Sequence, residues 1–177
     1  VFKDVVGGNG GFYFRVLTTT SSNTATLGTP VRCNDTAGNS VGNNAKNWQM
    51  SYNSTTGAIL IAYILLSGGG AGLQAKMCTV SGTTITQGTA VQINSNQPDT
   101  LASCHISSQN ALLCVFKRAD NSPPWFYSVI KEPSSGTTVL AGATNEVPNG
   151  SWTGAYHTVA FDPVKNIVIA AAMYTND

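Results

Sequence analysis

The chain has 177 residues, which is enough for one domain with a hydrophobic core, and only 10% of them are charged. The formal net charge is +1 and the nine basic residues are scattered, so we expect no nucleic-acid binding through a basic surface. The longest apolar run, at residues 58–66, is too short to span a bilayer, and no membrane insertion is expected. No signal peptide is visible at Val1, so we expect a processed chain or a piece of a longer one.

The main pattern along the chain is a threefold repeat of four predicted strands, which we call a, b, c and d. The repeats cover residues 12–72, 73–124 and 125–177. The start, VFKDVVGGNGGFYF, parallels VFKRADNSPPWFYS at residues 115–128, so residues 1–11 are expected to end a preceding repeat. Self-similarity with a period of roughly 50 residues indicates a repeat architecture.

Strand a is rich in aromatic and β-branched residues, which favour strands. Its three copies are predicted at residues 12–18, 73–80 and 125–131. After a turn rich in Ser, Gly and Asn, strand b is predicted at residues 24–33, 83–93 and 137–147. Each copy of strand b contains a glycine, at Gly28, Gly88 and Gly142. A glycine inside a strand marks a bulge or a close backbone approach, and its recurrence in register favours a bulge.

Strand c is predicted at residues 48–52, 100–105 and 157–161, and a tight turn leads from it into strand d. The c–d turns occupy residues 53–57, 106–110 and 162–166, and each ends in Gly or Asn, which tolerate positive φ. Asn53 and Asp162 begin two of these turns and can hydrogen-bond the turn backbone. The pattern therefore predicts antiparallel pairing of strands c and d, with Asp162 as a turn former rather than a catalytic acid.

Four short antiparallel strands per unit, repeated at this period, are typical of a β-propeller blade. Three blades are too few to close a propeller. The sequence thus predicts an all-β, partial propeller-like fold of about three four-stranded repeats. A β-trefoil is the alternative, because it also contains three four-stranded units.

The four cysteines take positions that other repeats fill with small or aliphatic residues. This favours free buried thiols over disulfides. Cys104 and Cys114 flank one predicted hairpin, and with a four-residue loop they lie one step off opposite and point to different faces. No Cys or His spacing suggests zinc, and we expect no metal and no cofactor.

The string VSGTTITQGTAVQI, together with the hairpin YNSTTGAILIAY, resembles repeats of tail-fibre and other virion-surface proteins of marine bacteriophages. The resemblance covers nearly the whole chain through its three repeats, although repeats 1 and 3 depart from it with TTTSSNTATLGTPV and KEPSSGTTVLAGAT. It implies a propeller-like scaffold at a virion surface or in another extracellular setting. It brings no functional residue to this chain.

A candidate binding face follows from where repeat length varies. The a–b and c–d turns keep nearly constant length, whereas the b–c connections (34–47, 94–99, 148–156) vary. In a meander the b–c loops and the d–a loops (66–72 and 118–124) emerge together, and insertions on one face often mark the binding face. Its amides, hydroxyls and tryptophans suit carbohydrate, although Trp48 and Trp125 lie on or next to strands and can be core residues. The candidate ligand contacts are Trp152, Asn149, Ser151, Asp99, Gln97, Arg118, Asp120 and Asn121.

Catalysis lacks support, because a glycosidase needs two carboxylates facing each other across a cleft. Asp35, Asp99 and Asp120 could converge, but nothing pairs them, and we predict no catalytic residue. The expected function is a non-enzymatic structural or adhesion module, extracellular or on a virion surface, that binds host-surface glycan. Expected partners are a glycan or host receptor, other virion or assembly subunits, and further copies of the chain. The alternatives are a carbohydrate-active enzyme whose acids lie partly outside this chain, and a purely structural virion spacer.

Overall fold

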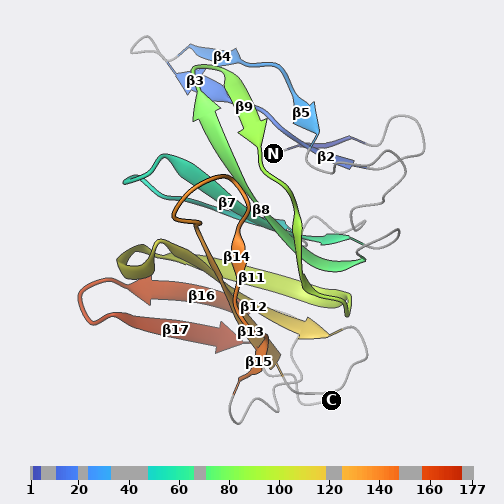
Figure 1. Cartoon of the computed structure of the whole chain (residues 1–177), viewed down its shortest axis with the longest axis vertical. Coiled ribbons are helices and arrows are strands. Elements are labelled where there is room, and N and C mark those ends of the chain that lie inside the picture. Colours follow the sequence, from blue (N-terminus) through green and yellow to red (C-terminus); the bar gives the residue numbers. More distant parts are fainter. Residues whose placement is uncertain are drawn as a thin grey trace.

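A computed structural model describes residues 2–4, 11–19, 24–32, 48–65, 71–118, 125–147 and 157–172. These residues form antiparallel strands and one 3-10 turn, Ser107–Gln109, with no α-helix among them, so the all-β prediction is confirmed. In this described part of the chain, no helix is long and apolar enough to cross a membrane. The sheets follow one another along the longest axis, from β3 and β4 at the top of Figure 1 to β16 and β17 below.

The strands form four successive layers. Layer 1 contains β1 (Phe2–Asp4), β2 (Gly11–Phe14), β3 (Leu17–Thr19), β4 (Ala25–Leu27) and β5 (Val31–Arg32). Layer 2 contains β6 (Trp48–Tyr52), β7 (Ala58–Leu65), β8 (Gly72–Ser81), β9 (Thr84–Gln87) and β10 (Val91–Asn94). Layer 3 contains β11 (Pro98–Ile106), β12 (Ala111–Arg118), β13 (Trp125–Lys131), β14 (Leu140–Ala141) and β15 (Asn145–Glu146). Layer 4 contains β16 (His157–Asp162) and β17 (Ile167–Ala172).

Each full layer joins two repeats. In layer 2, β6 and β7 are strands c and d of the first repeat, and β8, β9 and β10 supply strands a and b of the second. Layer 3 combines the second and third repeats in the same order. In layer 1, β1 pairs with β2 as β7 pairs with β8, so a strand d precedes strand a there too. Strand pairing within each of these layers is therefore continuous across the boundary between two repeats.

Apolar clusters fill the spaces between successive layers. Between layers 1 and 2 the buried members are Phe14, Ile61, Tyr63 and Cys78. Between layers 2 and 3 they include Leu60, Ile64, Leu73, Leu112 and Phe116. Between layers 3 and 4 they include Ala102, Ile106, Leu113, Trp125 and Val159. Because alternate residues of a strand face opposite sides, β7 and β12 each supply two clusters, and for that reason both are nearly continuous apolar runs.

The c–d turns have the predicted backbone. In each hairpin the strand pairing encloses a four-residue loop, as between Ile106 and Ala111. The last loop residue has positive φ in all three copies, at Gly57 (73°), Asn110 (47°) and Asn166 (54°). The single Gly or Asn at the end of each turn is therefore required by backbone conformation.

The first residue of two turns holds the turn backbone, as predicted. The Asn53 Oδ1 atom accepts the Thr55 N–H at 2.9 Å. The Asp162 Oδ1 atom accepts the N–H groups of Val164 and Lys165 at 2.9 and 3.1 Å. Asp162 is thus a turn former.

The strand b glycines mark bulges, as their recurrence predicted. In layer 2, Ala75 pairs with Val91 and Cys78 pairs with Gln87. Strand a advances three residues between these two pairs, whereas strand b advances four. Layers 1 and 3 show the same one-residue excess across Gly28 and Gly142. The glycine N–H still bonds to strand a, at 2.8 or 2.9 Å, in every copy. Strand b is therefore bulged at one fixed place per repeat.

Two of the strand b glycines, Gly28 and Gly88, also contact the backbone of the next repeat. A Cβ at Gly28 would lie 3.0 Å from the Thr83 carbonyl oxygen, which belongs to the following a–b turn. A Cβ at Gly88 would overlap the carbonyl oxygen of Thr137, the equivalent residue one repeat later. The glycine hence serves two needs, a bulge and a close backbone approach between repeats.

The cysteine prediction is confirmed for the described residues. Cys78 and Cys114 are buried and Cys104 is half-buried, and all three are free thiols. Cys104 faces Leu113 and Cys114 faces Ser103, so the two cysteines lie one step off opposite and contribute to different clusters. Burial raises the pKa of the Cys104 thiol, and it raises the pKa of Cys114 far above the ordinary value. Cys33 lies outside the described residues.

Candidate functional site

In the described part of the chain, the b–c connection at residues 94–99 meets the ends of two d–a connections at one end of the layers, which we call the loop end (residues 71–73, 94–99 and 118). The Gln92 side chain donates to the Ala71 carbonyl oxygen at 2.7 Å, which ties strand b to the d–a connection. A Cβ at Gly72 would overlap the carbonyl oxygen of Asn94, in the b–c connection. Pro98 pairs with Arg118, the last residue of strand d. The sequence prediction that b–c and d–a loops emerge together is confirmed in the described part of the chain.

The opposite end, which we call the turn end, carries the c–d and a–b turns, and hydrogen bonds link its layers. The carboxylate of Glu132, just after β13, accepts the Asn53 amide at 2.8 Å and the Thr56 hydroxyl at 2.8 Å. The Glu132 N–H donates to the Asn110 carbonyl oxygen at 3.2 Å. Glu132 is therefore used in joining layers 2 and 3, as Asp162 is used in its own turn.

The best described part of the loop end is the b–c connection between β10 and β11. The Asn94 Oδ1 atom accepts the Asn96 N–H at 2.8 Å and fixes the turn. Pro98 faces Arg118 but Thr100 faces Lys117, so Asp99 is one extra residue in β11. A bulge at a strand end re-aims its side chain, and Asp99 is exposed.

The predicted ligand contacts divide into two groups. Gln97 and Asp99 lie in the b–c connection, and Arg118 ends β12 directly opposite Pro98, so the structure brings these three to one end. The other five lie outside the described residues, namely Trp152, Asn149, Ser151, Asp120 and Asn121.

Two of the tryptophans contribute to the core. Trp125 is 1% exposed and belongs to the cluster between layers 3 and 4. Trp48 is half-buried and packs against the cluster between layers 1 and 2. The Trp125 indole therefore offers no open face to a ligand, and the Trp48 indole is only partly exposed.

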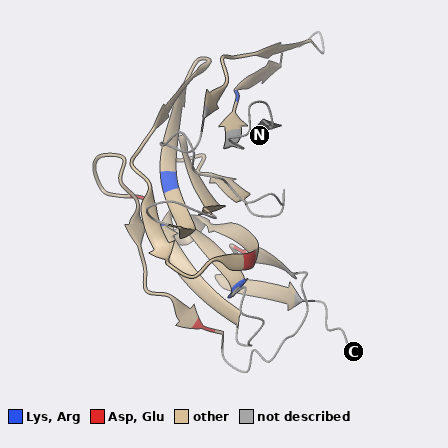
Figure 2. Ribbon diagram, turned by 90° about the vertical axis from the view of Figure 1, so that its right-hand side faces the viewer, with Lys and Arg blue, Asp and Glu red and all other residues tan. Residues whose placement is uncertain are grey.

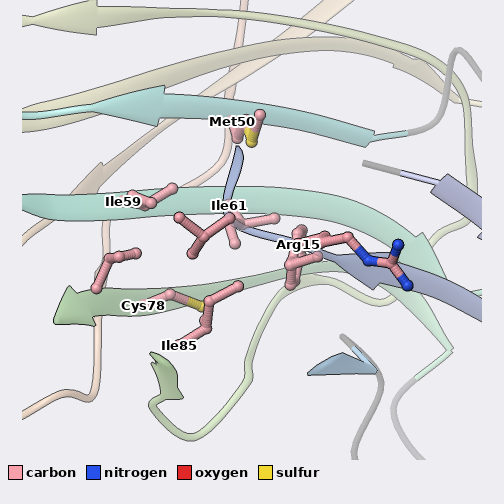
Figure 3. Close-up of a pocket in the computed structure, with 9 residues that line it drawn as sticks. Arg15, Met50, Ile59, Ile61, Cys78 and Ile85 are labelled. Carbon is pink, nitrogen blue, oxygen red and sulfur yellow. The ribbon is translucent and has the colours of Figure 1, made fainter. Parts of the chain in front are cut away.

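A cavity of about 180 Å³ lies between layers 1 and 2 (Figure 3). Its walls are mainly apolar, with Ile59, Ile61 and Ile85 among them, and the guanidinium of Arg15 points away from Cys78. Among the described residues, no set of converging polar groups for a ligand lines this cavity.

Charge does not concentrate anywhere in the described residues. Figure 2 shows Lys, Arg, Asp and Glu at separate places along the layers. No group of three His, Cys, Asp or Glu residues in this part of the chain could hold a metal ion. Comparison with known proteins found no matching family model, no matching curated protein and no matching solved structure.

Proposed function

We propose that this chain is a non-enzymatic structural and adhesion module of a virion surface or another extracellular assembly, and that its loop end binds host-surface glycan. One observation carries the proposal. The described b–c connection between β10 and β11, whose length differs from that of the other two b–c connections, meets the ends of the d–a connections at one end of the layers. The other end has turns of nearly constant length that are hydrogen-bonded between layers. A constant scaffold that presents variable loops at one end is the usual arrangement of a recognition protein.

The chemistry of the loop end supports a hydroxylated ligand. Asn96 and Asp99 are exposed there, and Gln97 is half-buried beside them. Amide and carboxylate groups form hydrogen bonds with sugar hydroxyls, and an indole gives a sugar ring an apolar platform. Trp152 is the remaining tryptophan for that platform, because Trp48 and Trp125 serve the core.

We infer that the layers are blades of a propeller-like array. Strands c of successive layers (β6, β11 and β16) run close together, whereas strands d and b of neighbouring layers are farther apart. Sheets that converge at one strand and diverge towards the other edge are arranged radially, as propeller blades are. In that arrangement the loop end is one rim of the array.

The described carboxylates near the loop end of layer 3 support binding without catalysis. Asp99 lies on β11 and Glu146 on β15, at opposite edges of the same sheet. Three inter-strand spacings of about 4.8 Å, or roughly 14 Å, separate their backbones. The two residues thus lie on strands that are not adjacent, whereas a glycosidase holds its two carboxyl groups about 5–9.5 Å apart across a cleft.

Trp152→Ala should weaken glycan binding roughly tenfold or more, because a stacking platform is worth about 1–2 kcal/mol. Asp99→Ala should weaken it by a smaller factor, since one exposed hydrogen-bonding group is lost. A glycan array would identify the ligand, and titration calorimetry with the best glycan would measure both variants.

Thr55→Ala is the matched control, because Thr55 is exposed at the turn end. Its affinity and melting temperature should equal those of the unchanged chain. The proposal fails if the chain binds no glycan, or if Trp152→Ala lowers the melting temperature while binding is kept. Turnover of a polysaccharide would instead favour an enzyme.

A further inference from the structure

Successive layers pack in one repeated way, with the next face of one layer on the previous face of the following layer. The next face of a layer is the side that packs on the following layer. On strand d it carries the first, third and fifth residues after the positive-φ residue that ends the c–d turn. In layer 2 it carries Ala58, Leu60 and Ala62, which are buried against layer 3. In layer 3 it carries Ala111, Leu113 and Val115, which are buried against layer 4.

Layer 4 presents the same positions without cover in the described part of the chain. Counting from Asn166, its next face carries Ile167, Ile169 and Ala171. Ile169 is 58% exposed, whereas its equivalents Leu60 and Leu113 are 1% and 7% exposed. The apolar next face that is buried in layers 2 and 3 is therefore exposed in layer 4 among the described residues.

At the other end of the stack, described residues on the previous face of layer 1 are exposed. Leu17 is 57% exposed and faces its cross-strand partner Leu27, which is 50% exposed. The equivalents of Leu17 on strand a are Cys78 and Ile130, since all three follow the residue whose carbonyl oxygen accepts the strand b glycine N–H. Cys78 and Ile130 are 1% and 0% exposed on the previous faces of layers 2 and 3. Among the described residues, layer 1 thus exposes part of its previous face, at Leu17 and Leu27.

We propose that a second copy of this chain docks head to tail, with the previous face of its layer 1 on the next face of layer 4. The two faces lie at opposite ends of the long axis (Figure 1), so one copy cannot bring them together by itself. Every interface between described layers joins a next face to a previous face, and a second copy supplies the missing member of each pair. This contact continues the interface that already holds the layers together, and it does not depend on the proposed glycan binding.

The composition of the two faces favours the contact. The strand residues of layer 4 that point away from layer 3 are Thr158, Ala160, Asp162, Ile167, Ile169 and Ala171, and the single charge among them belongs to Asp162, which is engaged in its turn. β3 and β4 carry no charged residue, and the nearest charge on the same side of strand a belongs to the half-buried Arg15. β17 also lacks the lysine, proline or inward charge that commonly blocks association through an edge strand. A heterologous contact of this kind builds rings or open chains of copies.

Two substitutions that each introduce a charge test the two faces independently. Ile169→Lys blocks the next face and Leu17→Lys blocks the previous face, and both positions are exposed in the single chain. In analytical ultracentrifugation the unchanged chain should exceed the monomer mass increasingly with concentration. Each variant alone should remain a monomer. An equal mixture should form dimers only, because each variant keeps the face that the other lacks.

Val164→Lys is the control, since Val164 is 91% exposed in the c–d turn of layer 4 and should not change the association of the chain. Circular dichroism of each variant checks that the fold is kept. The proposal is overturned if the unchanged chain stays monomeric at several hundred micromolar, or if the mixture stays monomeric. It is equally overturned if Leu17→Lys alone still dimerises, because that result means a symmetric contact between two layer 4 edges.

Discussion

Gly88→Ala is expected to destabilise the fold by about 3 kcal/mol, as overpacking of a tight contact does. A Cβ at this position would overlap the Thr137 carbonyl oxygen and lie 2.8 Å from the Thr137 Cβ. Gly88 has no positive φ, so the alanine would otherwise stabilise the chain by about 0.4–1 kcal/mol through the unfolded state. The close contact between repeats therefore determines whether the substitution raises or lowers the free energy of unfolding. Urea unfolding at equilibrium measures this change.

Two further variants test the cause. Gly28→Ala should cost less, because its nearest contact, the Thr83 carbonyl oxygen, is at 3.0 Å. Gly82→Asn should change stability by no more than about 0.5 kcal/mol, since Gly82 has nothing within 4 Å of a Cβ and asparagine tolerates its φ of 58°. Equal losses for Gly88→Ala and Gly82→Asn would contradict the proposed contact between repeats.

Trp125→Ala should destabilise the fold by about 3–5 kcal/mol, the usual loss for a large aromatic side chain in a core. Trp125 is 1% exposed, and its side chain belongs to the cluster between layers 3 and 4. Its loss leaves a cavity beside Leu113 and Val159, residues of the same cluster. Thermal unfolding followed by near-ultraviolet circular dichroism would show the change.

Tyr52→Ala is the aromatic control for Trp125. Tyr52 also lies on a strand, β6, but its side chain is 62% exposed, and its removal should cost less than about 1 kcal/mol. If Trp125→Ala instead left the melting temperature unchanged and abolished glycan binding, the indole would be a ligand contact rather than a core residue.

The parts of the fold predicted from sequence are those fixed by a single residue in a local backbone. Gly57, Asn110 and Asn166 allow the positive φ that ends each c–d turn. The glycine in each strand b allows a bulge, and the register confirms it. Such positions can be recognised without tertiary information because few residue types suit them, and because they recur at the equivalent place in each repeat.

The features that depend on distant partners were not predicted. Asn53 and Glu132 are 79 positions apart in the chain and meet only because layer 2 packs on layer 3. Lys76 is fully buried within a strand and donates to Gln87 at 3.1 Å, although charged side chains are rarely fully buried. In the candidate site, the grouping of loops followed from strand order, but the bulge that exposes Asp99 depends on its pairing with β12.

Disulfide trapping between repeats tests most directly whether each repeat docks its a–b turn on the strand b glycine of the preceding one. A Cβ at Gly28 would lie 3.2 Å from the Thr83 Cβ, a few tenths of an ångström below the usual disulfide range of about 3.5–4.5 Å. Mild oxidation of the Gly28→Cys, Thr83→Cys variant should therefore join positions 28 and 83 within one chain, as fragmentation mass spectrometry can establish. The Gly28→Cys, Thr137→Cys variant should not form the corresponding bond, because Thr137 approaches Gly88 instead. Equal trapping of the two pairs, or of neither, would contradict the arrangement of repeats described above.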